Sequence, residues 1–300
     1  MSYDLFFHPR GGELSREDLF EHCAGRSGYS SDEDDEDLIA YENEVTGVYF
    51  NLRFDEGTGD PDDEDDDDDR DEGGGPEVSF EIDAFRPFVF ALEAQIELGA
   101  LVKAFDLLVT DPQERGIEGG AWDGAAFLRG WTHLNELSYA TILRDEWDPD
   151  EPLYTLPRAE IERCWRWNIA YDKLVEELGE QYFVANIAFA AKRERTVVQA
   201  LWPDGRAILL PRVDEVLLLR GEGKKRESRL VTWDDLCAYV PALEKAPVPK
   251  PGEHWAVTEL EIGDRLAPFF TSGTSNARVS LIEADRVHAI EDVERARAAK

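Results

Sequence analysis

Alternation of apolar and polar residues marks the first strands of the chain. Apolar side chains occupy every second position in 48–54 and again in 78–82, which is the period of a half-buried strand. Shorter apolar runs predict further strands at 3–7, 38–41 and 107–109. We expect 48–54 and 78–82 to pair as a hairpin, with the acidic stretch between them as its loop.

Two helices are expected among these strands. Ser15, with Asp18 three residues later, is a variant of the capping box, so one helix begins there and runs to about Ala24. A second helix begins near Pro87 and carries a helically spaced apolar set: Leu98, Leu101, Val102 and Phe105. The order β-α-β-β-β-α-β predicts a ferredoxin-like, βαββαβ-type N-terminal half with one added strand.

The chain between the two strands of the expected hairpin is unusually long. Residues 55–76 separate the strands, whereas hairpin loops commonly have about 2–5 residues. Within this insert, 60–72 holds eleven acidic residues. We expect 55–76 to be a disordered acidic loop, because such a composition cannot bury enough apolar surface to fold.

A helical middle and a second set of strands follow. Helical spacing relates Phe127, Trp131 and Leu134, and again Trp167, Tyr171, Leu174 and Leu178. An antiparallel β-meander with flanking helices is expected in the C-terminal half, with strands at 184–191, 196–201, 207–210, 213–219 and 229–231. The fold class is therefore α+β. The proline-containing stretch 145–157 divides it into halves at 1–145 and 158–300, unless the two form one continuous domain.

Charge changes this picture more than any motif does. The chain has 66 acidic and 32 basic residues, a formal net charge of −34. Without the acidic runs 32–37 and 60–72, 49 acidic and 31 basic residues remain, so the rest still carries −18. Such a surface repels nucleic acid and anionic membranes and attracts cationic partners. The alternative is that the acidity serves only solubility or adaptation to salt.

The cysteines and the N-terminus indicate a reducing compartment. Cys23, Cys164 and Cys237 are far apart and form no Cys-x-x-Cys pair, so we expect reduced thiols and no disulfide framework. The chain opens without a basic and apolar leader, and no run approaches about 18 apolar residues. We therefore expect a cytoplasmic protein that does not interact with a membrane.

No motif for catalysis, cofactor binding or metal binding is present, so we predict no catalytic residue, no cofactor and no metal. Two residue groups offer weaker alternatives. Arg163 and Arg166 flank Cys164 and could lower the pKa of its thiol, but a core cysteine is favoured. His133 and Glu136 lie one helical turn apart, which favours a hydrogen-bonded surface pair over a metal site.

Five segments resemble a set of uncharacterised bacterial proteins. They are Met1-Ser-Tyr-Asp-Leu-Phe-Phe, Val45-Thr-Gly-Val-Tyr-Phe50, Phe85-Arg-Pro-Phe-Val-Phe-Ala-Leu-Glu93, Trp202-Pro-Asp-Gly and Leu210-Pro-Arg-Val-Asp214. Some proteins of that kind look like immunity proteins of polymorphic toxin systems. The resemblance implies a protein-binding role, but its motifs are packing and turn motifs, so it transfers no functional residue.

Two hypotheses about function follow from these observations. The first is an acidic, cytoplasmic protein-binding protein, of the immunity type, that neutralises a basic toxin or another cationic partner. The alternative is an enzyme or small-ligand-binding domain with a site between the two halves. For that site we nominate Arg86, Trp131, His133 and Glu136 as pocket residues.

Overall fold

The chain divides into two compact units, each described here by itself. Unit 1 comprises Met1–Glu151 and Asp292–Lys300, and unit 2 comprises Pro152–Glu291. Residues 292–300 thus group with unit 1, and not with the predicted C-terminal half 158–300. The computed structural model describes residues 1–11, 14–31, 34–57, 76–148, 150–193, 195–203, 206–240, 244–245, 254–257, 265–271 and 276–298. The predicted acidic loop lies mostly outside the described residues.

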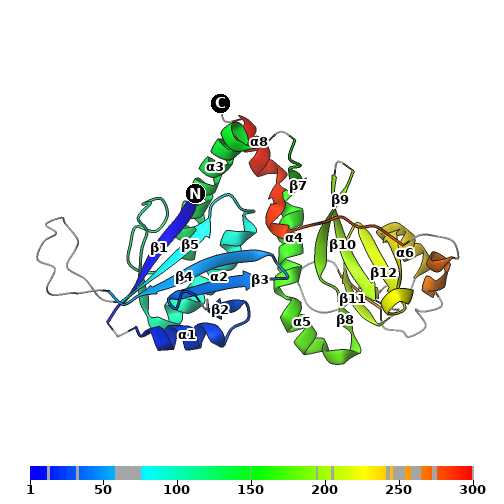
Figure 1. Cartoon of the computed structure of the whole chain (residues 1–300), viewed down its shortest axis with the longest axis horizontal. Helices are drawn as coiled ribbons and strands as arrows, with labels where there is room; N and C mark the ends of the chain where they lie inside the picture. Colours follow the sequence, from blue (N-terminus) through cyan, green and yellow to red (C-terminus); the bar gives the residue numbers. More distant parts are fainter. Residues whose placement is uncertain are drawn as a thin grey trace, which may run out of the picture. The chain divides into compact units, whose positions relative to one another are not determined.

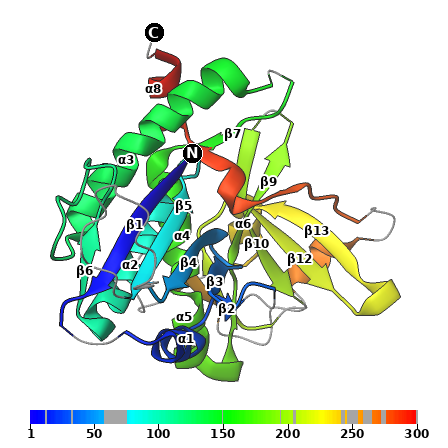
Figure 2. The ribbon, with the colours of Figure 1, turned by 60° about the vertical axis from the view of Figure 1, so that its left-hand side comes forward.

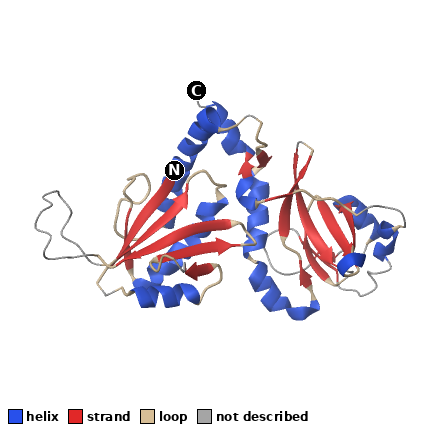
Figure 3. Ribbon diagram, in the orientation of Figure 1, coloured by secondary structure: helices blue, strands red, loops and turns tan. Residues whose placement is uncertain are grey.

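Both units combine helices with sheets, so the predicted α+β class is confirmed (Figures 1 and 3). In the described part of the chain, no helix has both the length and the apolar character that a membrane span requires.

Among its described residues, unit 1 has a sheet of six strands in the order β2-β3-β4-β5-β1-β6. Its strands are β1 (Ser2–Pro9), β2 (Tyr29–Ser31), β3 (Leu38–Asn43), β4 (Val48–Asp55), β5 (Glu77–Asp83) and β6 (Leu107–Thr110). All neighbours pair antiparallel, and β4 and β5 form the predicted hairpin. The order β6-β1-β5-β4, with helices after β1 and β5, has the connections expected of a ferredoxin-like unit. Strand β2 was not predicted, because three residues are too few to show a period.

Helices cover one face of this sheet (Figure 2). They are α1 (Arg16–Ala24), α2 (Val89–Phe105) and α3 (Gly124–Thr141), which continues as a π-helical turn (Ile142–Glu146); α8 (Ile290–Ala298) ends the chain. Ser15 caps α1 as predicted, since its hydroxyl accepts a hydrogen bond from the backbone N–H of Asp18.

The two faces of the unit 1 sheet differ in character. Tyr3 and Phe80 are buried beneath the helices, and both rings contact Phe127 of α3 at centroid distances of 5.8 and 6.1 Å. On the opposite face, Asp4 of β1 lies directly across from Glu81 of β5. Period-2 alternation thus separates an aromatic core from a polar, acidic surface.

A buried polar network attaches β1 to the loop that precedes α3. The Tyr3 hydroxyl donates a hydrogen bond of 2.6 Å to Asp111, whose carboxylate also accepts backbone N–H groups of Gly116 and Ile117. Burial raises the pKa of Tyr3, with the hydrogen bond to Asp111 as the next cause, so the phenol stays a donor. Gly116 and Gly130 pack closely here: a side chain on Gly116 would collide with the α3 backbone at Ala126 and Gly130, and one on Gly130 would collide with the Tyr3 hydroxyl and with Gly116.

The described residues of unit 2 form sheets of five, four and two strands, in the orders β13-β12-β10-β9-β16, β14-β15-β11-β8 and β17-β7. The strands are β7 (Tyr154–Leu156), β8 (Phe183–Val184), β9 (Ile187–Lys192), β10 (Arg195–Pro203), β11 (Ile208–Pro211), β12 (Glu215–Arg220), β13 (Glu227–Thr232), β14 (Glu244–Lys245), β15 (His254–Val257), β16 (Leu281–Ile282) and β17 (Val287–Ala289). The helices are α4 (Arg158–Ile169), α5 (Tyr171–Leu178) and α6 (Trp233–Tyr239), with 3₁₀ turns at Gly179–Gln181, Gly223–Lys225, Ala267–Phe270 and Ala284–Arg286.

The predicted meander is wrong in two respects. Strand β10 pairs in parallel with β12, and β11, expected to return along β10, instead joins β8 and β15 in another sheet. Most of β10 is buried, which is typical of an interior strand whose partners its own pattern does not specify. The helix predicted to include Trp167 and Leu178 is likewise two helices, which meet at Ala170.

Helix α4 is fixed to the sheet by polar contacts. The Asn168 side chain donates to the Ile187 carbonyl and accepts from the Ile187 N–H, at 3.0 and 2.9 Å. The Trp167 indole N–H donates to the Ala185 carbonyl at 2.7 Å. These contacts satisfy backbone groups beside the start of β9, where the ladder alone would leave them unpaired.

Replacing Gly130 with alanine should destabilise unit 1. The added methyl group would collide with the Tyr3 hydroxyl oxygen and would lie 2.9 Å from the Cα atom of Gly116. We expect the free energy of unfolding, measured by urea denaturation, to fall by about 1–3 kcal/mol. Gly99→Ala is the matched control: its methyl group would meet only Trp122 Nε1 at 3.4 Å, so the gain in helix propensity should keep stability level or raise it. If Gly130→Ala and Gly99→Ala lowered the free energy of unfolding equally, close packing of Gly130 against Tyr3 would not explain the loss.

Candidate functional site

The acidity of the chain is concentrated in unit 1. This unit holds 44 acidic and 13 basic residues, a net charge of −31, whereas unit 2 holds 22 and 19, a net charge of −3. Excluding the runs 32–37 and 60–72 leaves 27 acidic and 12 basic residues in unit 1, or −15. The residual acidity of the folded surface, −18 for the whole chain, is therefore mostly a property of unit 1.

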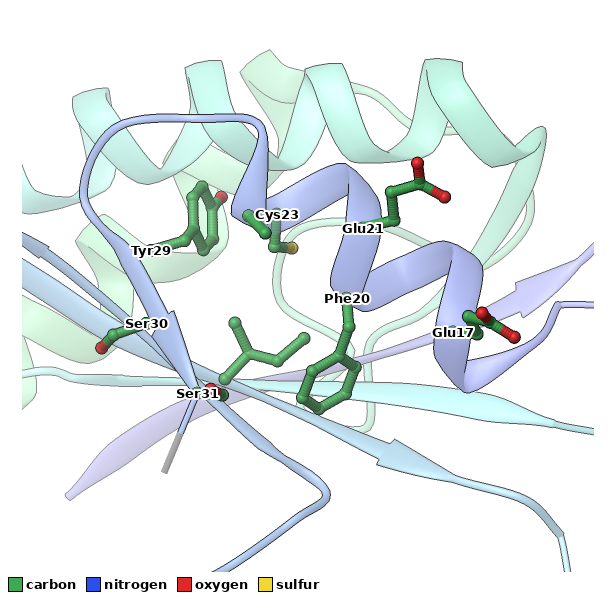
Figure 4. A pocket seen from close by; sticks show the side chains of 9 residues that line it. Glu17, Phe20, Glu21, Cys23, Tyr29, Ser30 and Ser31 are labelled. Atoms are coloured by element: carbon green, nitrogen blue, oxygen red, sulfur yellow. The ribbon is translucent and has the colours of Figure 1, made fainter. Parts of the chain in front are cut away.

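A groove of about 780 Å³ lies in unit 1 between α1 and the β2–β3 edge of the sheet. Its lining combines carboxylates with apolar and aromatic side chains: Glu17, Phe20, Glu21, Cys23, Ala24, Tyr29, Ser30, Ser31 and Ile39. Figure 4 shows Phe20 pointing from α1 toward β2, with Glu17 and Glu21 on the same helix at the edge of the groove. The groove therefore has an apolar interior and an acidic border.

The described part of the first acidic run adjoins this groove. Arg16, at the start of α1, forms ion pairs with Glu36 and Asp37 at 3.6 and 3.1 Å. Its guanidinium also lies 4.8 Å from the centroid of the Phe20 ring. The chain thus already places one guanidinium against an aromatic ring and carboxylates at this groove, a combination that favours cations.

The inner wall of the groove is held by a polar cluster. The Tyr29 hydroxyl donates to Glu97 of α2 at 3.2 Å, and Arg26 forms a 2.6 Å ion pair with the same carboxylate. The Tyr29 ring also contacts Tyr41 edge-on at 4.9 Å. Burial raises the pKa of Tyr29, and the charge of Glu97 adds to this shift, so the hydroxyl remains protonated. The wall is a fixed, neutral aromatic surface.

None of the groove residues is among the pocket residues predicted from the sequence. Glu17, Phe20 and Glu21 were assigned only to a capped helix, and β2 was not predicted, so the wall that Tyr29 forms could not be anticipated. The one indication of this groove in the sequence is an aromatic residue, Tyr29, three residues before the acidic run 32–37.

The four nominated pocket residues do not form one site. His133 and Glu136 lie on exposed positions of α3 and line a cavity of about 190 Å³ together with Asp292 and Arg295 of α8. Glu136 forms a 2.7 Å ion pair with Arg295, which also lies 3.3 Å from Asp292. The carboxylates of this cavity are therefore engaged in holding α8 against α3 within unit 1.

Arg86 and Trp131 lie away from that cavity. Arg86 forms a 3.1 Å ion pair with Asp83, and its guanidinium lies 5.2 Å from the Tyr49 ring centroid. Trp131 is buried in the core of unit 1. These two nominees contribute to packing rather than to the lining of the cavity beside His133.

The thiol and metal alternatives find no support among the described residues. Cys164 is fully buried, and desolvation raises the pKa of its thiol to about 12, despite the opposing charge of Arg163. Arg163 instead pairs with Glu160 at 2.5 Å. Within the described ranges, no group of three or more His, Cys, Asp or Glu side chains could hold a metal ion.

The chain was compared with family models, curated proteins and solved structures, and none of them matches it significantly.

Alkylation should distinguish a core cysteine from a nucleophile. At pH 8 we expect iodoacetamide to modify the partly exposed Cys237 first, while Cys164 reacts on the order of a thousandfold more slowly than a free thiol, because so little thiolate forms. Burial also raises the pKa of Cys23, to about 11, so it should be protected as well. Peptide mass mapping with and without urea measures the order. Modification of Cys164 in the folded chain as fast as Cys237 would restore the nucleophile hypothesis.

Proposed function

We propose that this chain is an acidic protein-binding protein that holds a cationic segment of a partner against unit 1. The observation that carries the proposal is the charge difference between the units, −31 against −3. A charge serving solubility alone has no reason to concentrate in one unit. A strongly negative surface accelerates the encounter with a positively charged protein and orients it.

The groove between α1 and β2 supplies the short-range contacts that would hold the partner once charge has brought it near. Steering by charge contributes more to association rate than to affinity, and affinity usually depends on a few desolvated aromatic or arginine contacts. Phe20 and Tyr29 offer aromatic surface, and Glu17 and Glu21 offer carboxylates at the border. An arginine or lysine side chain of the partner could therefore bury its aliphatic part in the groove and keep its charge beside the carboxylates.

The exposed sheet face supports the same interpretation. Asp4 and Glu81 are directly opposite each other on neighbouring antiparallel strands, an arrangement that destabilises a sheet by like-charge repulsion. Glu81 faces Asn51 on its other side, which offers no opposite charge. Acidity retained at a cost in stability is more readily explained by binding than by folding.

The kind of partner that fits is a basic protein, and the resemblance to immunity proteins makes a basic toxin the specific candidate. Cytoplasmic location is part of this proposal. It is supported by the three cysteines, Cys23, Cys164 and Cys237, all of which are free thiols.

Removing the two border charges should weaken binding of a cationic probe. We expect Glu17→Gln/Glu21→Gln to reduce the affinity of the full chain for a fluorescent arginine-rich peptide about threefold or more at low salt. Fluorescence anisotropy measures the affinity, and the difference from the unchanged protein should shrink as NaCl is raised, because exposed charges are screened.

The matched control is Asp172→Asn/Glu176→Gln on α5 of unit 2. It removes the same charge from two exposed positions at the same helical spacing. If both double variants lose affinity equally, only net charge matters and the groove has no special role. Failure of the unchanged protein to bind the peptide at low salt would overturn the proposed function.

A further inference from the structure

Another cavity, of about 410 Å³, lies within unit 2 beside the tip of the β9–β10 hairpin. It is lined by the segment that leads into β7 and by the hairpin: Pro152, Leu153, Tyr154, Thr155, Arg193, Arg195 and Thr196. Strands β7 and β10 contact each other in unit 2. Its volume is within the range of about 300–1,000 Å³ that small-molecule sites occupy.

Two arginines of this cavity are not neutralised within the described structure. Antiparallel pairing of Lys192 with Arg195 closes the hairpin, and Arg193 adopts a left-handed backbone conformation at its tip, with φ of 58°. Lys192 has a carboxylate partner in Glu215. No carboxylate of the described residues forms an ion pair with Arg193 or Arg195, in a chain with twice as many acidic as basic residues.

Thr196 provides a second, independent observation. This residue is only 8% exposed, and its hydroxyl is buried without a hydrogen-bond partner among the described residues. Buried polar groups are nearly always satisfied, and leaving a hydroxyl unpaired costs stability. A valine at this position would have the same shape and no such cost, so the hydroxyl has an unused hydrogen-bonding capacity toward groups beyond the described residues.

We propose that this cavity binds a small organic phosphate. A phosphoryl group carries up to two charges on three terminal oxygens, which can accept hydrogen bonds from two guanidiniums and a hydroxyl together, whereas one guanidinium satisfies a carboxylate. The apolar and aromatic lining, which includes Leu153 and Tyr154, accommodates the organic part of the ligand. The site lies in unit 2 and does not depend on the cation-binding role of unit 1.

Calorimetric titration of the full chain at low salt tests the site with three probes: phenyl phosphate, inorganic phosphate and benzoate. We expect phenyl phosphate to bind most tightly. Arg193→Gln/Arg195→Gln should weaken its binding about tenfold or more. The control Arg206→Gln/Arg278→Gln removes the same charge from exposed positions of unit 2 and should leave the affinity unchanged. Benzoate binding as tightly as phenyl phosphate, equal losses in both double variants, or no binding at all would overturn the proposal.

Thr196→Val separates a ligand contact from a purely structural defect. If the hydroxyl contacts the phosphate, the variant should bind phenyl phosphate several-fold more weakly, while its thermal midpoint without ligand stays level or rises. Unchanged affinity with a raised midpoint would show that the hydroxyl is only an unsatisfied core group, and would overturn its assignment to the site.

Discussion

One buried carboxylate holds the outer strands of the unit 1 sheet against helix α2. Glu93 of α2 is completely buried, and its Oε1 atom accepts hydrogen bonds from Tyr41, Asn43 and Thr46 at 2.7, 2.8 and 3.0 Å. A carboxylate without such donors would be costly in this environment. The three donors belong to β3 and the turn that follows it, so Glu93 fixes the outer hairpin of the sheet onto α2. Tyr41 in turn contacts Tyr29, and the wall of the acidic groove is positioned through this contact.

Local sequence signals predicted the inner part of this fold and failed at its edges. The alternation in β4 and β5 and the Ser15 cap are properties of a few neighbouring residues, and the structure confirms both. Strand β2 has three residues and is held by its pairing with β3, which no local pattern expresses. The same limit explains β10, whose buried residues show that it is interior without showing that β12 is its parallel neighbour.

The candidate sites were less predictable than the fold, because they depend on where distant segments meet. His133 and Glu136 were nominated from helical spacing, and the α3 helix does place them beside one cavity. Helical spacing could not show that Arg295, some 160 residues later by number, would neutralise Glu136. The groove and the arginine cavity each combine two segments in the same way, so composition could indicate their charge but not their location.

Net charge and local charge therefore carry different information in this protein. The total of −34 predicts repulsion of anions at long range, yet at physiological salt the field of exposed charges decays over about 8 Å. Among the described residues that line the cavity of unit 2, the charged ones are Arg193 and Arg195, and at close range their guanidiniums favour an anion. A cation at Glu17 and Glu21 likewise interacts with the carboxylates of unit 1. A local excess of guanidiniums in unit 2 can therefore favour a small anion, even though the net charge of the chain favours a cationic protein.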